Sequence, residues 1–255
     1  MSLDILTPTS FAGLKIEKPN NDTTDNLNML IYGEAGVGKT WLAGSASRVP
    51  AMRNVLYVDA EAGKATLKEH PDVEIVPAHR WNDYVSIYQA LKGGAHRYRT
   101  VVLDSLSEIL EQCKDQVMVE MKLDPENEKR DEDIPSIREW GKLQVRLQRL
   151  IRLYRDLPMN VIFIAHAERV QLKGGKTKWM PMLNGKLQMK VPQIPDIVLF
   201  MYTQEVDGAQ RRLALTGQTD IAVAKVRGAT MPQIIGADEE VTMQAIVNYY
   251  NKDKV

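Results

Sequence analysis

The sequence predicts an α/β fold in which helices cover both faces of a mainly parallel sheet. Short apolar runs typical of buried strands alternate with longer segments of helical periodicity. A glycine-rich loop follows the first of these runs. The last three runs are short and separated by turn residues, so we expect antiparallel pairs at the C-terminal side of the sheet.

Residues 1–27 form a poorly patterned arm, and residues 28–255 are expected to form one domain. Apolar runs bounded by turn residues predict the strands of this domain. Gly208 lies between two of the runs and indicates a hairpin. The strands are expected at 27–32, 54–59, 73–76, 100–104, 160–166, 197–203, 211–216 and 221–226.

Helical periodicity with start and stop signals predicts the helices, the second of which ends at Gly93-Gly94. The charged, proline-containing residues 122–135 are predicted to be a solvated loop, and the stretch 171–190, rich in glycine and lysine, a second one. The helices are expected at 39–47, 81–92, 105–121 and 136–157.

The composition is typical of a soluble domain. Of 255 residues, 44% are hydrophobic and 26% charged, and 33 basic side chains balance 33 acidic ones. No apolar run is long enough to cross a membrane, and no secretory leader is recognisable. The single cysteine, Cys113, cannot form an internal disulfide and is expected to pack on a helix, so we expect a cytoplasmic protein. Since the net charge is zero, nucleic acid would have to be bound by local patches.

A phosphate-binding loop follows the first strand. The spacing GxxxxGKT has a strand before it and a helix after it, and backbone N–H groups of such a loop turn inward around phosphate oxygens. We therefore expect Lys39 to reach the β- and γ-phosphates of ATP and Thr40 to bind Mg²⁺. The expected nucleotide-binding residues are Gly33, Glu34, Ala35, Gly36, Val37, Gly38, Lys39, Thr40 and Trp41.

A second acid favours a Mg²⁺-nucleotide site. Asp104 ends the apolar run TVVLD, where a carboxylate is costly unless it is solvated or paired. In phosphate-loop ATPases an acid in this position holds Mg²⁺ directly or through water. The alternative is an ordinary strand-end acid that caps the helix beginning at Ser105. A guanine-reading NKxD pattern at a strand end and an arginine-rich lid are both missing, so an ATPase is favoured over a GTPase or a small-molecule kinase.

Five further segments resemble the RecA recombinase family in their order. VLYVDAE at 55–61, VVLDSL at 101–106 and VIFIAH at 161–166 are similar to the family's FIDAE, VIDSV and LIFINQ. LNGKLQ at 183–188 lies where GGNAL closes the family's second DNA-binding loop, and AVAKVRG at 222–228 looks like VVKNK. The resemblance covers roughly residues 28–228. It implies a RecA-like P-loop NTPase core.

The resemblance also implies roles for the matching residues. Glu61 becomes the general base that polarises the attacking water, and Asp104 lies at the metal. His166 takes the γ-phosphate sensor position, where RecA has Gln. Lys225 and Arg227 become cations that reach the ATP of a neighbouring subunit, which implies a homo-oligomer, filament or ring. A surface acid at a strand end is the alternative for Glu61, and a merely hydrogen-bonded histidine is the alternative for His166.

Two basic segments are candidates for contact with DNA. Residues 170–191 combine glycines, lysines and an aromatic ring without any acid, as single-strand-binding loops do, although a surface hairpin with incidental lysines is the alternative. The basic face of the helix at 136–157 is either a solvated face or a contact with DNA or another subunit. The expected single-stranded DNA contacts are Lys173, Lys176, Lys178, Trp179 and Lys186.

These observations together predict an ATP-hydrolysing, Mg²⁺-dependent protein that binds single-stranded DNA and is stimulated by it. The chain lacks RecA's C-terminal domain and its long N-terminal helix, and in this it looks like the phage-encoded RecA-like single-strand annealing ATPases. A function in phage-type recombination or annealing is therefore expected. Two alternatives stay open: a helicase motor or helicase loader on the same core, and a nucleotide-gated binding module with little turnover.

Overall fold

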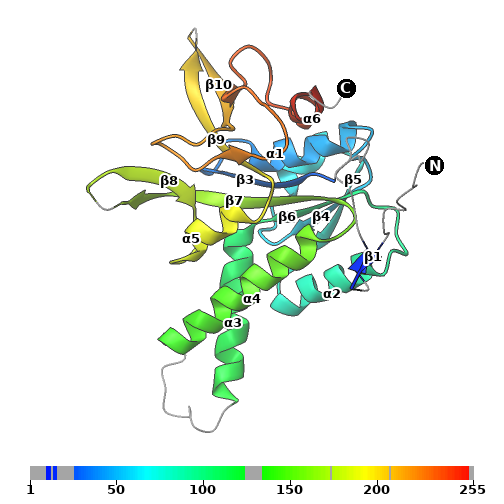
Figure 1. Cartoon of the computed structure of the whole chain (residues 1–255), viewed down its shortest axis with the longest axis vertical. Helices are drawn as coiled ribbons and strands as arrows, with labels where there is room; N and C mark the ends of the chain where they lie inside the picture. The colour runs from blue at the N-terminus through cyan, green and yellow to red at the C-terminus, as the bar shows by residue number, and fades with distance from the viewer. Residues whose placement is uncertain are drawn as a thin grey trace, which may run out of the picture.

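A central sheet with helices on both faces organises the chain (Figure 1). A computed structural model describes residues 10–12, 14–15, 26–123, 134–172, 174–206 and 208–252. Lys173, most of the arm expected at 1–27 and most of the loop expected at 122–135 lie outside these residues. Among the helices that are described, none is both long and apolar enough to span a bilayer.

Ten strands of the described chain make up the main sheet, and a separate small ribbon pairs β1 (Ser10–Phe11) with β2 (Leu14–Lys15). The main strands are β3 (Asn28–Gly33), β4 (Val55–Asp59), β5 (Val73–Pro77), β6 (Thr100–Asp104), β7 (Asn160–Gln171), β8 (Thr177–Pro181), β9 (Ile197–Val206), β10 (Ala209–Leu215), β11 (Lys225–Val226) and β12 (Ile234–Ile235).

The interior of the sheet is parallel, and its C-terminal side is antiparallel. The strand order is β12-β10-β9-β3-β7-β6-β4-β5, in which every pair from β9 to β5 runs parallel. β10 pairs antiparallel with both β9 and β12. Gly208, with φ of 76°, lies between β9 and β10, as the sequence predicted for a hairpin. The predicted fold class is therefore confirmed.

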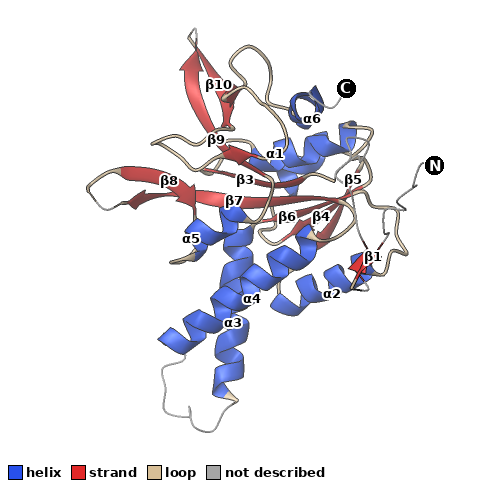
Figure 2. Ribbon diagram, in the orientation of Figure 1, coloured by secondary structure: helices blue, strands red, loops and turns tan. Residues whose placement is uncertain are grey.

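The helices form two layers around the sheet (Figure 2). Helices α2, α3 and α4 cover one face, and α1 and α6 cover the other, each over its own apolar cluster. The helices are α1 (Lys39–Gly44), continued by a 3-10 turn at Ser45–Arg48, then α2 (Trp81–Lys92), α3 (Leu106–Lys122), α4 (Ile137–Arg155), α5 (Leu187–Lys190) and α6 (Met243–Asn251).

Local sequence explains where the two long helices begin. Ser105 caps α3 by accepting a hydrogen bond from the Glu108 amide, and Ser136 and Glu139 form a capping box at the start of α4. The apolar side of α4 is buried against the sheet and α3. Its fully buried members include Leu143, Leu147, Leu150, Ile151 and Tyr154.

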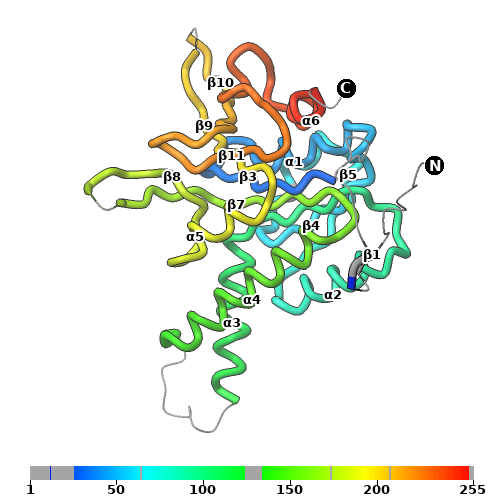
Figure 3. Tube along the Cα trace, viewed as in Figure 1, coloured from blue at the N-terminus to red at the C-terminus, as the bar shows by residue number. Residues whose placement is uncertain are grey.

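Three predictions from the sequence were wrong or incomplete. The stretch 171–190 is not one long loop, because β8 returns along β7 as an antiparallel hairpin and α5 follows (Figure 3). The strand expected at 221–226 is regular only at β11, and Ala222 instead makes an isolated bridge to Trp179. The short strand β12 and helix α6 were not predicted.

Candidate phosphate-loop site

The loop at 33–40 leaves the carboxyl end of β3 and enters α1. Gly36 and Gly38 have φ of 78° and 95°, a left-handed conformation that favours glycine. Gly33 is required for a different reason, because a Cβ there would lie 2.4 Å from the carbonyl oxygen of Met201 on β9. The sequence therefore folds into a tight turn that leads directly into a helix N-terminus.

Lys39 is held inside this loop. Its Nζ donates hydrogen bonds to the carbonyl oxygens of Gly33 and Glu34, at 3.0 and 2.8 Å, and the residue is 7% exposed. Burial lowers the pKa of the Lys39 amine, whereas the nearby carboxylates of Asp104 and Glu61 raise it. The loop thus contains one buried cation that faces two acids.

Thr40 and Asp104, the two residues predicted at the metal, are in direct contact. The Thr40 hydroxyl donates to Oδ2 of Asp104 at 2.8 Å, and the Tyr57 hydroxyl donates to the same oxygen. Asp104 is 7% exposed, and burial raises the pKa of its carboxyl group while the two hydroxyl hydrogen bonds lower it. Tyr57 was not predicted, although it lies two residues before Asp59 and therefore on the same side of β4.

Glu61, just beyond the end of β4, and His166, in the middle of β7, are also brought together. The His166 Nε2 atom lies 2.9 Å from Oε1 of Glu61, and Ser105 donates to the same oxygen. The hydrogen bond from His166 is the main reason that the pKa of Glu61 is lowered; desolvation raises this pKa, and Ser105 and the charge of Lys39 lower it further. Both side chains are about a third exposed, at 32% and 31%, so a water molecule can reach them.

A buried carboxylate supports the turn that carries Glu61. Oδ1 of Asp59 accepts hydrogen bonds from the amides of Glu61 and Gly63, at 3.2 and 3.1 Å. The residue is 2% exposed, and its Oδ2 has no hydrogen-bond partner among the described residues. Asp59 belongs to the segment VLYVDAE but was not predicted as a site residue. Its hydrogen bonds fix the backbone of the turn that carries Glu61.

His166 connects the site to the β7–β8 hairpin. Its amide donates to the Ser107 hydroxyl at 3.2 Å, and this hydroxyl donates to the carbonyl of Met182 at 3.1 Å. The Met182 amide donates to the His166 carbonyl at 2.8 Å, next to the first pair of the hairpin, Ala167 with Pro181. A displacement of His166 would therefore act on the base of the hairpin.

Trp41 lies beside the loop under an arginine that the sequence did not indicate. The Arg212 guanidinium carbon, from β10, is 5.6 Å from the centre of the Trp41 ring, and Arg48 lies over the same ring at 5.9 Å. A Cβ on Gly38 would come within 3.0 Å of Arg212 Nε. Arg212 is far from the loop in sequence, so only the strand order places it there.

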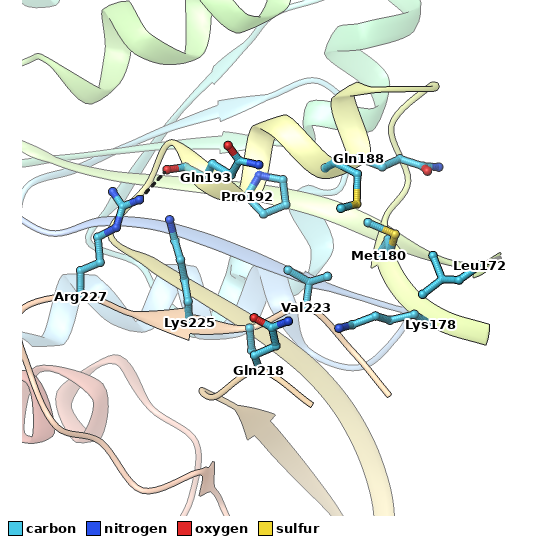
Figure 4. A pocket seen from close by; sticks show the side chains of 12 residues that line it. Leu172, Lys178, Met180, Gln188, Pro192, Gln193, Gln218, Val223, Lys225 and Arg227 are labelled. Carbon is cyan, nitrogen blue, oxygen red and sulfur yellow. Dashed lines mark hydrogen bonds between the residues drawn. The ribbon is translucent and has the colours of Figure 1, made fainter. Parts of the chain in front are cut away.

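Lys225 and Arg227 do not join the predicted residues of the phosphate-loop site. Lys225 pairs with Val198, near the start of β9, whereas the phosphate loop meets β9 at Met201. Figure 4 shows Lys225 and Arg227 side by side at one end of a cavity of about 320 Å³. Arg227 donates to the Gln193 carbonyl at 3.1 Å.

The Lys225 amine is the less satisfied of these two cations. Its Nζ is buried without a hydrogen-bond partner among the described residues. Burial, together with the charge of Arg227, lowers the pKa of Lys225 to about 8. An added anion at this end of the cavity would therefore be favoured.

The residues predicted to contact DNA lie on and beside the β7–β8 hairpin. Lys176 is exposed and pairs with Asp220 at 3.3 Å, and Lys178 lines the cavity of Figure 4. The Trp179 ring stacks on Phe200 at 5.8 Å and carries the Arg169 guanidinium 4.8 Å from its centre. This ring is therefore already engaged within the chain. Lys186 directly precedes α5.

The donor set suits Mg²⁺ if phosphate oxygens complete it. Among the described residues, no group of three or more His, Cys, Asp or Glu side chains could hold a metal ion alone. Thr40 and Asp104 supply a hydroxyl and a carboxylate oxygen, and Mg²⁺ is usually bound by few protein oxygens together with substrate phosphates. A cation would also offset the cost of the buried Asp104 charge.

Comparison with known proteins gives one family. A family model described as "AAA domain" matches residues 25–228. None of the curated proteins compared with the sequence matches it. Two solved structures are similar. One is a KaiC-like protein from Pyrococcus horikoshii, with 15% identity and a TM-score of 0.42 over 73% of this chain and 76% of that one. The other is the flagellar accessory protein FlaH from Methanocaldococcus jannaschii, with 10% identity and a TM-score of 0.44 over 82% and 83%.

Proposed function

Since the chain belongs to the AAA domain family and is a P-loop ATPase with a RecA-like fold, we propose that it hydrolyses Mg²⁺-bound ATP. We propose further that this hydrolysis controls its binding to single-stranded DNA. The observation that carries this proposal is the 2.9 Å contact between Glu61 and His166. It joins Glu61, whose charge acts on Lys39 of the phosphate loop, to the strand that continues into the β7–β8 hairpin.

In this proposal the phosphate loop, Asp104 and Glu61 have different functions in hydrolysis. Backbone amides between residues 33 and 40 surround the triphosphate, and Lys39 leaves its two carbonyl partners to contact the β- and γ-phosphates. Thr40 and Asp104 would hold Mg²⁺, which supplies charge neutralisation on the phosphates. Glu61, whose pKa is lowered below its ordinary value, is a carboxylate at neutral pH and can orient a water molecule for in-line attack.

The hydrogen bonds of His166 support the proposed coupling between ATP hydrolysis and DNA binding. A water molecule and a γ-phosphate beside Glu61 would compete with the imidazole for Oε1. His166 would then shift, and the Ser107 and Met182 hydrogen bonds would pass this shift to the hairpin that carries Lys176, Lys178 and Trp179. We assign recombination or annealing as the process, because an exposed basic hairpin suits a strand held along its backbone.

The location of Lys225 and Arg227 supports ATP sites shared between subunits. These cations lie beside the start of β9, whereas the chain's own phosphate loop meets this strand three residues further on, at Met201, and Lys225 is left without a hydrogen-bond partner in the described structure. An anion from a second copy, such as its ATP, would satisfy them. Variants Lys39→Ala and Arg227→Ala should each be inactive alone, whereas their mixture should regain part of the ATPase activity. A mixture as inactive as its components would reject shared sites.

The experiment that tests the whole proposal is the ATPase rate with and without single-stranded DNA. We expect stimulation, and we expect the variant with Lys173, Lys176 and Lys178 changed to Ala to lose it together with DNA affinity and salt dependence. A matched variant with Lys68, Lys92 and Lys252 changed to Ala, all exposed elsewhere, should behave as wild type. A rate indifferent to DNA would reject the coupling. Strand displacement by the wild type would point instead to a helicase.

A further inference from the structure

The outer side of α4 carries a row of cations that the proposed function does not use. Arg138, Lys142, Arg149 and Arg152 are exposed, and their spacing of four, seven and three residues places them on one side of the helix. Val145, 66% exposed, lies on the same side. At 1.5 Å per residue the row is about 21 Å long.

No acid of the described chain neutralises this row by an ion pair. Glu139, the one acid within α4, is buried at its first turn. Arg146, on the flank of the helix, pairs with Glu120 of α3 at 2.9 and 2.5 Å. The charge of Lys142 also lowers the pKa of Glu120, but the ion pairs of the described residues include none of the four cations of the row. Like charges on one side of a helix repel each other. A bound polyanion would remove this repulsion.

A groove between α2 and α4 opens beside the row. It encloses about 380 Å³, and Arg149 lines it as well as belonging to the row. Trp81 and Tyr88 of α2 form an aromatic wall, and Leu150 and Leu153 of α4 lie opposite. Trp81 is only partly buried, so its ring is accessible from the groove. An aromatic wall next to a row of cations is the combination with which proteins hold unpaired bases and their phosphates.

One flank of α4 also lies close to the segment that follows the β7–β8 hairpin. A Cβ on Gly185, just before Lys186, would lie 3.6 Å from the Gln144 side chain on the flank of α4. The segment after the hairpin and α4 are therefore neighbours. Duplex DNA fits less well, because its bases are stacked and paired and cannot enter the groove.

We propose that the α4 row and the α2–α4 groove bind a single-stranded nucleic acid, with phosphates along Arg138, Lys142, Arg149 and Arg152 and one base against Trp81. The inference deepens the proposed function, from which it takes the class of ligand. It adds a second contact surface, on the helical face of the sheet, to the one on the hairpin.

The test is the binding of a fluorescent oligo-dT by anisotropy across a range of salt concentrations, with the full chain. Changing Arg138, Arg149 and Arg152 to Gln should lower affinity at least tenfold at low salt. It should also make the slope of log K against log salt shallower by about 2, since each single-strand phosphate contact contributes about 0.7. A variant with Lys68, Lys92 and Lys252 changed to Gln removes the same charge elsewhere and should match wild type.

The groove is tested separately. Trp81→Leu keeps an apolar side chain but cannot stack a base, so binding should weaken about fivefold or more, and Trp81→Phe should restore most of the loss. ATP turnover without DNA should be unchanged in all of these variants, because none of them touches the phosphate loop. This readout also shows that they fold.

Three results would overturn the inference. If the wild type binds oligo-dT but the α4 variant keeps its affinity and slope, the row is not a contact, and the proposed function stands without it. If duplex competes as well as single strand and Trp81→Leu is neutral, the single-strand assignment is wrong. If poly-glutamate displaces the oligonucleotide from α4 as readily as oligo-dT does, the surface serves an acidic protein. A wild type that fails to bind any single strand rejects the DNA part of the proposed function itself.

Discussion

Replacing Glu61 with Gln removes the carboxylate that we assign to the attacking water while keeping the shape of the side chain. The structure leaves one acid in this position, since Asp104 is engaged by Thr40 and Tyr57 and Asp59 is buried in the turn below. The amide of Gln can still accept a hydrogen bond from Ser105 or His166. ATP binding should therefore stay within a few-fold of wild type.

The expected loss lies in turnover. A positioned general base contributes about 10²–10⁴-fold, which corresponds to about 3–5 kcal/mol of activation free energy. We expect the lower part of this range, because Glu61 is 32% exposed and solvent water can replace part of its function. Single-turnover ATP hydrolysis separates this step from product release.

The matched control is Glu74→Gln, the same change at an acid that pairs with Arg97 on the surface. It should leave kcat unchanged. If Glu61→Gln lowers kcat by less than about threefold while the wild type turns over, Glu61 is not the base. The same substitution also distinguishes a nucleotide-gated module, in which the wild type itself would bind ATP without appreciable turnover.

Two further predictions rest on hydrogen bonds to the site's carboxylates. His166→Ala removes the main cause of the lowered pKa of Glu61, so this pKa should rise and the acid limb of the kcat profile should move to higher pH; an unmoved limb would show that the contact does not tune Glu61. In the wild type the contribution of the Glu61 charge to the free energy of unfolding is present above pH 4.5 and is lost as the pH falls through the lowered pKa of Glu61. Tyr57→Phe removes a hydroxyl that lowers the pKa of buried Asp104, so the Mg²⁺ concentration that gives half-maximal ATPase activity should rise. It should also cost about 1–3 kcal/mol in urea unfolding, and unchanged values for both would refute the role of Tyr57.

Much of the fold could be predicted because its signals are local. Buried parallel strands are continuous apolar runs, so Thr100–Asp104 was predicted with its observed bounds, and helix 81–92 was bounded by Gly93. The hairpin at β8 was missed because TKWMP lies in a stretch with the glycines and lysines of a loop, and the pairing with β7 that stabilises it comes from outside the segment. The strand predicted at 221–226 is incomplete for a similar reason, since this segment pairs with Trp179 and β9, which are distant in sequence.

The site shows the same division between local and long-range information. The glycine loop and Asp104 carry their own chemistry in sequence, and they were predicted. Tyr57 and Arg212 have no motif, and they enter the site only because β4 and β10 present them there. Their contribution depends on the strand order, which no local pattern contains.

The most direct test of the account is equilibrium ATP binding and turnover by Lys39→Ala. Lys39 is the one buried cation of the loop, and its two carbonyl contacts are to be exchanged for phosphate oxygens. A charged hydrogen bond is worth about 1.5–3 kcal/mol, so affinity should fall about tenfold or more and turnover should be lost, with the fold retained by circular dichroism. Affinity and turnover equal to those of the parent would contradict a triphosphate held between residues 33 and 40.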